Sequence, residues 1–353
     1  MKIPAIVQVL AFPLSILYQL VLRIRNSMFT LGILKETRFD IPTISVGNLA
    51  FGGTGKTPHI EYLIRFISKH YKTAVLSRGY KRKTKSYVFA NANSTAEQIG
   101  DEPQQIKVKF PETAVAVSED RVLGLPMLLQ DAPETQIVLL DDCYQHRYLK
   151  PGLNILLTDY SKLYCEDFLF PVGTLREYAA ASNRADMVVV TKCPQELPAS
   201  AQEKIVKKLK LQKHQQVFFS SLKYDSICLY DNSTVELKKK VLFFAGIANI
   251  DPVFHYLKTL YQEIEIVHFN DHHAYKKEEL RNLETHFKQL GDEWQILTTE
   301  KDLSKLNTEE NLDFLAEHQV CILPIQVVFI ENENSGNFNQ TILDYVGKNQ
   351  SNP

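Results

Sequence analysis

The chain has 353 residues, which is long enough for two domains that each bury a sizeable hydrophobic core. Its formal net charge is −1 at pH 7 and its isoelectric point is near 6.8, which excludes a strongly basic protein that binds nucleic acid through its overall charge. The five cysteines are scattered and form no C-x-x-C pair. This pattern excludes a disulfide framework and a cysteine zinc site, and it indicates reduced thiols in the cytosol.

The first predicted element is an apolar helix at the N-terminus. Residues 3–22 carry no charge and are flanked by basic residues, which is typical of a segment that associates with a membrane. Their number is near the minimum for a transmembrane span. The weakly polar residues Gln8, Ser15 and Gln19 share one side of the helix. The helix can therefore lie in the membrane interface with this side against the protein, which is an alternative to crossing the membrane. We predict a membrane-associating segment over residues 1–35, with an ordinary core helix as the remaining alternative.

A glycine-rich loop follows the next predicted strand. The stretch Thr43–Pro58 reads TISVGNLAFGGTGKTP, and the residues after it repeat apolar side chains at helical spacing. A loop between a strand and a helix directs backbone N–H groups at one point, where a lysine and a hydroxyl can bind phosphate and Mg²⁺. Ala50 replaces the first glycine of the usual G-x-x-x-x-G-K-[ST] pattern, which the loop tolerates if the φ of Ala50 is negative. The residues that we assign to the nucleotide are Gly52, Gly53, Thr54, Gly55, Lys56 and Thr57.

Strands and helices alternate after this loop. The predicted strands cover 73–76, 113–117, 137–140, 154–158, 187–191 and 217–220. A helix that starts at Thr95 is interrupted by the sequence GDEP at 100–103. The alternation predicts an α/β fold of the P-loop NTPase type over residues 36–222, with a mostly parallel sheet flanked by helices.

The pattern of elements changes near Leu222. A short hairpin is expected around Asp231 and Asn232, and a helix is expected from Pro252. The strands predicted after it cover 241–244, 264–269, 295–298 and 321–323. These elements predict a second, smaller α/β domain over residues 223–345, which ends in a short helix. The polar residues 346–353 are predicted to form a frayed tail.

Two pairs of adjacent carboxylates are candidates for chemistry. Asp141 and Asp142 end an apolar strand beside the phosphate loop, where a carboxylate meets Mg²⁺ in P-loop folds. A turn-capping role for one of the two is the alternative. Asp101 and Glu102 stand at the break in the helix, where a base that accepts the proton of an alcohol and an exposed turn both fit the sequence.

The sequence Asp271-His272-His273 follows a predicted strand of the second domain. Adjacent histidines point in different directions, which disfavours a site where both bind one metal ion. One histidine can orient an acid of the first domain or balance its charge, and a solvent-exposed loop is the alternative. The arginines that are candidates for binding phosphate groups, with a solvated surface as the alternative, are Arg78, Arg82, Arg121, Arg147 and Arg176.

Taken together, these motifs resemble the tetraacyldisaccharide 4′-kinase family of the lipid A pathway. The segments that carry the resemblance are SVGNLAFGGTGKTP, SRGYKR, GDEP at 100–103, LLDDCYQHRYL at 139–149, PVGTLREY at 171–178, FAGIANIDPVF at 244–254, FNDHHAY at 269–275 and TEKD at 299–302. They occur in the family's order over nearly the whole chain. The family also begins with a hydrophobic helix and commonly lacks the first glycine of the loop. The chain departs from the family at Lys81, Cys143, Tyr144 and Thr174, where Gly, Gly, Phe and Pro are usual.

The resemblance implies a kinase that transfers the γ-phosphate of ATP to the 4′-hydroxyl of a tetraacylated glucosamine disaccharide 1-phosphate. This lipid A disaccharide precursor would be the substrate, and membrane lipids would be a further partner. The expected location is the cytoplasmic face of the bacterial inner membrane, where the N-terminal helix either spans the membrane once or lies in its interface. No nucleic-acid partner is expected.

The resemblance also assigns roles to individual residues. Besides the loop, the residues that it assigns to ATP and Mg²⁺ are Asp141 or Asp142 and Glu177. Asp101 would be the catalytic base, paired with a histidine of the second domain, for which we favour His272 over His273. Lys56 would stabilise the phosphoryl group during its transfer.

A membrane-associated P-loop switch or partition ATPase that acts through protein partners is the main alternative. The signature lysine of the partition ATPases would fall at Phe51, so this signature is absent. The base-recognition motif of GTPases is also absent, because TKCP at 191–194 ends in proline and not in aspartate. A non-catalytic scaffold is the least favoured interpretation, since Lys56, Thr57, Asp101 and Asp141 are all in place. The sequence predicts no oligomeric state.

Overall fold

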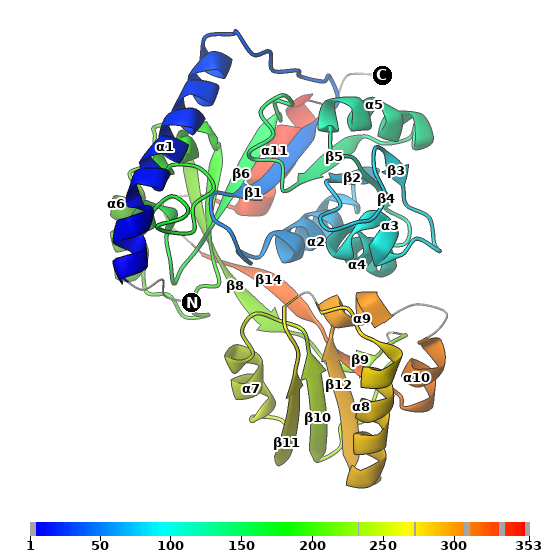
Figure 1. Cartoon of the computed structure of the whole chain (residues 1–353). Coiled ribbons are helices and arrows are strands. Elements are labelled where there is room, and N and C mark those ends of the chain that lie inside the picture. The colour runs from blue at the N-terminus through cyan, green and yellow to red at the C-terminus, as the bar shows by residue number, and fades with distance from the viewer. Residues whose placement is uncertain (1–4, 232, 272, 307–310, 332–335, 350–353) are drawn as a thin grey trace.

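The computed structural model describes residues 5–231, 233–271, 273–306, 311–331 and 336–349, without the side chains of residues 5–10. The chain forms a large and a small α/β unit, which lie one above the other in Figure 1. The large unit contains a mostly parallel sheet with helices on both faces. The predicted fold class is therefore confirmed.

The large unit is built on a sheet whose strand order, among the described residues, is β14-β8-β7-β6-β1-β5-β2-β4-β3. Its strands are β1 Thr43–Asn48, β2 Thr73–Ser77, β3 Val88–Phe89, β4 Ala114–Val117, β5 Ile137–Asp141, β6 Leu153–Asp159, β7 Met187–Thr191, β8 Gln216–Tyr224 and β14 Ile325–Ile330. The central strands pair in parallel, whereas the edge strands β3 and β14 run antiparallel to β4 and β8. Strands β1, β2, β5 and β7 are buried along their whole length because helices cover both faces of the sheet.

The helices of the large unit place the candidate functional residues at the ends of the strands. They are α2 Lys56–Ile67, α3 Ala96–Ile99, α4 Asp101–Lys109, α5 Arg121–Asp131, α6 Ala199–Leu209 and α11 Phe338–Asn349, with short 3₁₀ turns at Tyr164–Glu166 and Ala179–Arg184. Helix α2 follows β1, and Asp141 ends β5, the strand paired with β1. Because parallel strands end at the same edge of a sheet, the phosphate loop and this carboxylate lie together.

The small unit has a second, mostly parallel sheet. Its strand order among the described residues is β11-β10-β12-β13-β9, and β9 runs antiparallel to β13. Its elements are β9 Cys228–Leu229, β10 Lys240–Ala245, α7 Asp251–Leu257, β11 Glu263–His268, α8 Lys277–Leu290, β12 Trp294–Thr299, α9 Glu300–Leu306, α10 Leu312–Glu317 and β13 Cys321–Leu323. The expected turn after β9 is closed by a hydrogen bond from the N–H of Leu229 to the carbonyl of Ser233, at 2.9 Å. Asn232 lies outside the described residues.

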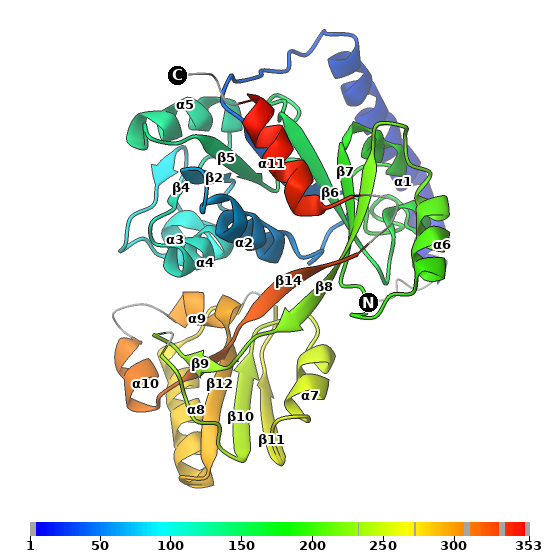
Figure 2. The same ribbon diagram turned by 180° about the vertical axis from the view of Figure 1, so that it is seen from behind.

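Strands β8 and β14 connect the two units. They pair antiparallel from Phe219 and Ile330 in the large sheet to Tyr224 and Ile325 beside the small unit. Figures 1 and 2 show them crossing together from one unit to the other. Helix α4 of the large unit also packs against α9 of the small unit, which closes the interface on the side of the phosphate loop.

The C-terminal part of the chain returns to the large unit. The sequence pattern predicts instead that residues up to 345 belong to the small domain and that a frayed tail begins at residue 346. Strand β14 extends the large sheet, and α11 buries Phe338, Ile342 and Val346 in the core beside β1. The hydroxyl of Tyr345 donates a hydrogen bond to the carbonyl of Thr43 at 3.0 Å. The structure therefore differs from the predicted small domain over 223–345, and of the frayed tail predicted over 346–353, residues 346–349 belong to α11 while the remainder lies outside the described residues. The apolar side of α11 is short and stands among polar residues, so the sequence pattern did not predict its packing against the large unit.

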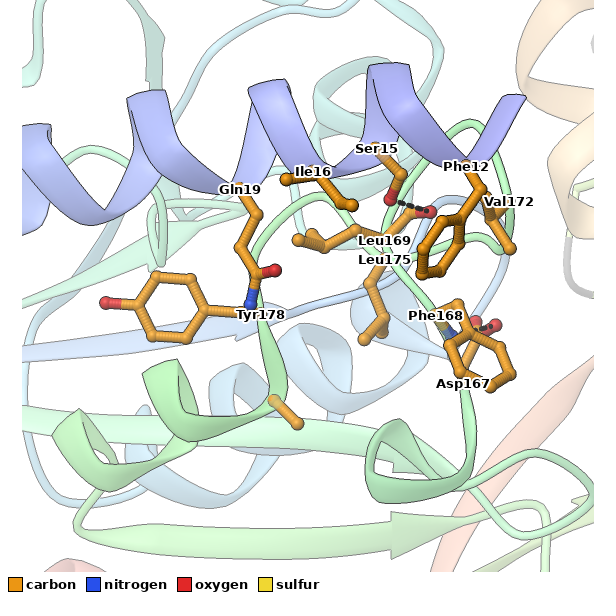
Figure 3. Close-up of a pocket in the computed structure, with 11 residues that line it drawn as sticks. Phe12, Ser15, Ile16, Gln19, Asp167, Phe168, Leu169, Val172, Leu175 and Tyr178 are labelled. Atoms are coloured by element: carbon orange, nitrogen blue, oxygen red, sulfur yellow. Dashed lines mark hydrogen bonds between the residues drawn. The ribbon is translucent and has the colours of Figure 1, made fainter. Parts of the chain in front are cut away.

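The N-terminal helix α1, Ala5–Thr30, lies along the large unit. In Figure 3 the hydroxyl of Ser15 donates a hydrogen bond to the carbonyl of Leu169, at 3.2 Å, and Gln19 faces the same pocket of about 190 Å³. The hydroxyl of Tyr18 donates to the carbonyl of Arg176 at 2.8 Å. The weakly polar side of the helix thus faces the protein at Ser15 and Gln19, which is the arrangement expected for a helix that lies in the interface. The side chain of Gln8 is outside the described part.

The opposite side of α1 is apolar and exposed. More than half of the surface of each of the following side chains on this side is accessible to solvent: Leu14, Leu17, Leu20, Val21 and Ile24. Phe12 and Ile16 are exposed to a similar degree, but they line the pocket with Ser15 and Gln19. Among the described residues, no helix combines the length and the apolar character that crossing a bilayer requires.

Candidate active site

The phosphate loop between β1 and α2 has a backbone that requires glycine at two positions. Gly52 and Gly55 have φ angles of 106° and 88°, in the left-handed region that disfavours residues with a Cβ. Ala50 is not among the residues with positive φ, so the missing first glycine is compatible with the loop, as expected. The N–H of Phe51 donates to the carbonyl of Thr174 at 2.7 Å, which ties the loop to the segment under α1.

Buried polar side chains hold this loop from the sheet side. The hydroxyl of Thr54 accepts a hydrogen bond from Nδ2 of Asn48 at 2.9 Å, and the carbonyl of Thr54 accepts one from the hydroxyl of Thr191 at 2.9 Å. Nδ1 of His59 lies 2.7 Å from the carbonyl of Gly55. Burial lowers the pKa of His59 to about 4, so the neutral ring donates this hydrogen bond through Nδ1–H. The loop is therefore held by contacts with the sheet and with α2.

Lys56 lies beside the two aspartates at the end of β5. Its side chain is 9% exposed, and Nζ is 3.8 Å from Oδ2 of Asp142. The same oxygen accepts a hydrogen bond from Nη1 of Arg176 at 3.0 Å, while Oδ2 of Asp141 accepts one from the hydroxyl of Ser77 at 2.9 Å. The structure thus brings together the predicted loop lysine, the two aspartates among the predicted metal ligands and one of the predicted arginines.

The two aspartates differ in their electrostatics. Burial raises the pKa of Asp141, and the neighbouring charge of Asp142 raises it further. Burial acts in the same direction on Asp142, but the charges of Lys56 and Arg176 outweigh it and hold the pKa of Asp142 below its usual value. Oδ1 of each aspartate is buried and accepts no hydrogen bond from the described residues. Two buried carboxylate oxygens without partners are suitable ligands for Mg²⁺, which prefers oxygen ligands.

Glu102 belongs to this site, although the sequence analysis gave it no separate role. Burial raises its pKa to about 7, and the charges of Asp141 and Asp142 contribute, while Lys56 acts in the opposite direction. Glu102 therefore lies within electrostatic reach of the loop lysine and of both aspartates. Its position follows from the first turn of α4, which starts at Asp101.

The break before α4 depends on Gly100. Its φ is 93°, and a Cβ at this position would lie 3.0 Å from backbone atoms of Gly79. The close approach brings the segment SRGYKR, which follows β2, against the start of α4. The two carboxylates at the helix start are thereby held over the end of the sheet and not in an exposed turn.

The small unit contributes charged groups opposite Asp101. Nζ of Lys305 is 3.9 Å from Oδ2 of Asp101 and 3.6 Å from Oδ1 of the fully buried Asp302. Nζ of Lys301 is 2.7 Å from Oδ1 of Asp271. Asp101 thus lies where the two units meet, and the lysines of α9 beside it were not anticipated.

Of the two predicted histidines, the structure describes only His273. His272 lies outside the described residues. His273 stacks on Phe269, with 4.6 Å between the ring centroids, and its Nε2 is 2.9 Å from Oε2 of Glu279. Since both partners belong to the small unit, His273 is held within that unit.

Glu177 is placed beside α1. It is 1% exposed, and its carboxylate accepts hydrogen bonds from Nη2 of Arg184 at 2.7 Å and from Nδ2 of Asn26 at 2.9 Å. These contacts connect α1 to the segment that carries Arg176, the partner of Asp142. Its role as a metal ligand stays a prediction.

The five predicted arginines separate into different environments. Arg121 and Arg176 both contact Asp142. Nη2 of Arg121 donates to the backbone carbonyl of Asp142 at 3.5 Å, and Nη1 of Arg176 donates to its carboxylate. The side chain of Arg82 is 2% exposed and is paired with Glu119 at 2.6 Å. Arg147 is paired with Glu36 at 2.7 Å, and its guanidinium lies over the ring of Phe29 of α1. Arg78 is exposed next to the start of α4.

Glu102 should make the stability of the protein depend on pH. Because its pKa is raised from 4.5 to about 7, the folded protein binds more protons than the unfolded chain between these values, and the free energy of unfolding decreases as the pH rises. Between pH 5 and pH 8, we expect the free energy of unfolding of Glu102→Gln to rise by about 2 to 3 kcal/mol relative to that of the native protein. Urea denaturation of both proteins without divalent cations measures this difference; parallel stability curves would contradict it.

Comparisons with known proteins show to which family the chain belongs. The family model LpxK, described as Tetraacyldisaccharide-1-P 4'-kinase, matches residues 7–346. A protein named tetraacyldisaccharide 4'-kinase from Flavobacterium johnsoniae is 45% identical to the chain, over 96% of the chain and 97% of that protein. A protein of the same name from Phocaeicola vulgatus is 42% identical, over 97% of the chain and 96% of that protein. The crystal structure of LpxK from Aquifex aeolicus in complex with ATP has a TM-score of 0.75 at 26% identity, over 98% of this chain and 100% of that one. The chain therefore belongs to the tetraacyldisaccharide-1-P 4'-kinase family.

Proposed function

We propose that the protein transfers the γ-phosphate of ATP to the 4′-hydroxyl of a tetraacylated glucosamine disaccharide 1-phosphate, in lipid A biosynthesis. The observation that carries this proposal is the convergence of Lys56, the aspartates after β5 and the carboxylates of α4 at one end of the large sheet. A loop that binds triphosphate and a carboxylate that faces it are the two parts that phosphoryl transfer to an alcohol requires.

The phosphate loop supplies positive electrostatic potential for the donor. In this proposal the backbone N–H groups of Gly52, Gly53 and Gly55 and the N-terminus of α2 face the phosphates, and Lys56 adds a full charge. The N–H of Thr54 instead donates to the carbonyl of Gly52 at 3.1 Å. Because Lys56 is largely shielded from water, its interaction with a transferring phosphoryl group is stronger than it would be at the surface.

The residues that would hold Mg²⁺ are Thr57, Asp141 and Asp142, with Glu177 as a further candidate. The unpartnered Oδ1 atoms of the two aspartates fit this role. Bound there, Mg²⁺ would neutralise charge on the phosphate oxygens. Arg176 donates a hydrogen bond to Oδ2 of Asp142 and so orients this carboxylate.

We assign the role of catalytic base to Asp101, with His272 as its partner. As the acceptor oxygen forms its bond to the γ-phosphorus, the bond from phosphorus to the leaving oxygen breaks, and Asp101 takes up the hydroxyl proton. Nζ of Lys305 lies 3.9 Å from Oδ2 of Asp101, so an amino group of the small unit faces the candidate base. Exposed Arg78 is a candidate for contact with a phosphate of the acceptor.

The exposed apolar side of α1 supports attachment to the cytoplasmic face of the inner membrane, where the lipid acceptor and membrane lipids would be partners. We expect the double variant Leu17→Glu and Leu20→Glu to weaken binding to lipid vesicles at least about tenfold, since each leucine transferred from lipid to water costs about 1.5 to 3 kcal/mol. Both side chains are more than half exposed, so the fold should be unaffected. Sedimentation with vesicles measures binding, and Leu123→Glu, at an exposed leucine of α5, is the control. Equal binding of the double variant and the control would contradict the proposal.

The function is tested by incubating the purified protein with labelled ATP and a lipid A disaccharide precursor. The expected result is a labelled lipid that carries the phosphate on its 4′-oxygen. Turnover of ATP at the same rate with and without the acceptor would favour instead a switch or partition ATPase that acts through protein partners.

A further inference from the structure

The contact between α4 and α9 has an ion pair at each end. Helix α4 begins with Asp101, which faces Lys305 near the C-terminus of α9. It ends with Lys109, whose Nζ is 2.6 Å from Oε1 of Glu300, the first residue of α9. The two helices therefore run antiparallel, and the pair of Lys109 and Glu300 lies at the end away from the candidate base.

Lys109 also binds the helix of the phosphate loop. Its Nζ is 2.6 Å from Oε2 of Glu61 on α2, and Oε1 of Glu61 accepts a hydrogen bond from Gln105 at 2.6 Å. Oε2 of Glu300 accepts a hydrogen bond from the backbone N–H of Ile325 at 3.2 Å, where β14 starts. One ammonium group thus joins the phosphate-loop helix, the helix that carries Asp101 and the small unit.

This cluster is largely buried and places one ammonium group between two carboxyl groups. Glu61 is 2% exposed, and the side chains of Lys109 and Glu300 are 19% and 12% exposed. Burial lowers the pKa of Lys109, but the two carboxylates outweigh burial and raise it above its usual value, so Lys109 stays protonated. Without Lys109 the two carboxylates would repel each other across the interface between the units.

We propose that Lys109 is a positioning residue, which docks the small unit on the phosphate-loop helix and so sets the position of α9 relative to Asp101. Its kinetic consequence rests on the proposed kinase function. Lys109 stands at the opposite end of α4 from Asp101, so it acts on the geometry of the site and not on the transferred groups. Misplacement of catalytic groups by about 1 Å can lower a rate on the order of 100-fold.

The test uses the full chain with Lys109→Met, Lys109→Arg and Glu300→Gln. We expect Lys109→Met to lower kcat about ten- to 100-fold with little change in KM for ATP, and Lys109→Arg to restore most of the rate. Glu300→Gln breaks the ionic contact between the units and keeps the pair of Glu61 and Lys109 inside the large unit. It should therefore lower kcat without loss of the fold.

Hydrogen exchange provides a readout that needs no acceptor. The amides of α4 and α9 should exchange faster in Lys109→Met and in Glu300→Gln than in the native protein. Lys208→Met is the control, because it breaks an ion pair of similar length, 2.7 Å to Glu166, that is exposed and lies within the large unit. Native kcat and native exchange in both variants would overturn the proposal. A native protein that phosphorylates no acceptor would overturn the function while leaving the exchange result to decide the docking.

Discussion

Asparagine in place of Asp101 is expected to lower kcat for the lipid acceptor by about 10²- to 10⁴-fold, which is the usual contribution of a positioned general base. The side chain keeps its shape but no longer accepts the hydroxyl proton. Binding of ATP should change little, because the phosphate loop is fixed by its own contacts with Asn48, Thr191 and His59. Steady-state kinetics with the acceptor and calorimetric titration with ATP measure the two effects separately.

A matched control for this variant is Glu112→Gln, at an exposed carboxylate just after α4. It removes one negative charge near the same helix without contact with the site. If Asp101→Asn retains a turnover close to that of the control, Asp101 is not the base. Glu102, whose pKa is raised to about 7, would then be the next candidate.

Methionine in place of Lys56 is expected to lower kcat/KM by about 10²- to 10³-fold, which is the usual cost of removing one preorganised group that stabilises the transition state. Lys56 is the loop's cation, and Asp142, Asp141 and Glu102 surround it. Its removal should also raise the pKa of Glu102 further, because the charge of Lys56 acts to lower that pKa. Kinetics and an NMR titration of the Glu102 carboxyl test both expectations.

The control for Lys56→Met is Lys69→Met, at an exposed lysine just beyond the other end of α2. This substitution changes the net charge equally and leaves the phosphate loop intact. An activity of Lys56→Met within tenfold of the control would show that the loop binds the nucleotide without contributing to the transfer.

Local patterns were sufficient for the large features of this protein. Apolar runs predicted most strands of both sheets, and the glycine-rich loop between a strand and a helix predicted the phosphate site. The positions of Gly52, Gly55 and Gly100 confirm why those residues are glycines, because each adopts a φ that other residues disfavour. Asp141 and Asp142 were found because parallel strands end at one edge of the sheet.

Other features depended on contacts between distant segments. Strand β14 was not predicted, because its six residues gain their role from pairing with β8, roughly a hundred positions earlier. Glu102 was left beside Asp101 without a role, since only the packing of α4 against the phosphate loop buries it near Lys56. The small unit's contribution of Lys301 and Lys305 was missed for the same reason.

The sequence alone therefore determined the fold class, the phosphate loop and the identity of the charged residues, since these follow from local spacing and backbone geometry. Tertiary structure decided which charges meet. It assigned β14 and α11 to the large unit, placed Glu177 and Arg147 beside α1, and buried Lys109 between Glu61 and Glu300. Burial and long-range proximity set the pKa values and ion pairs of these groups, and neither quantity is encoded in a short stretch of sequence.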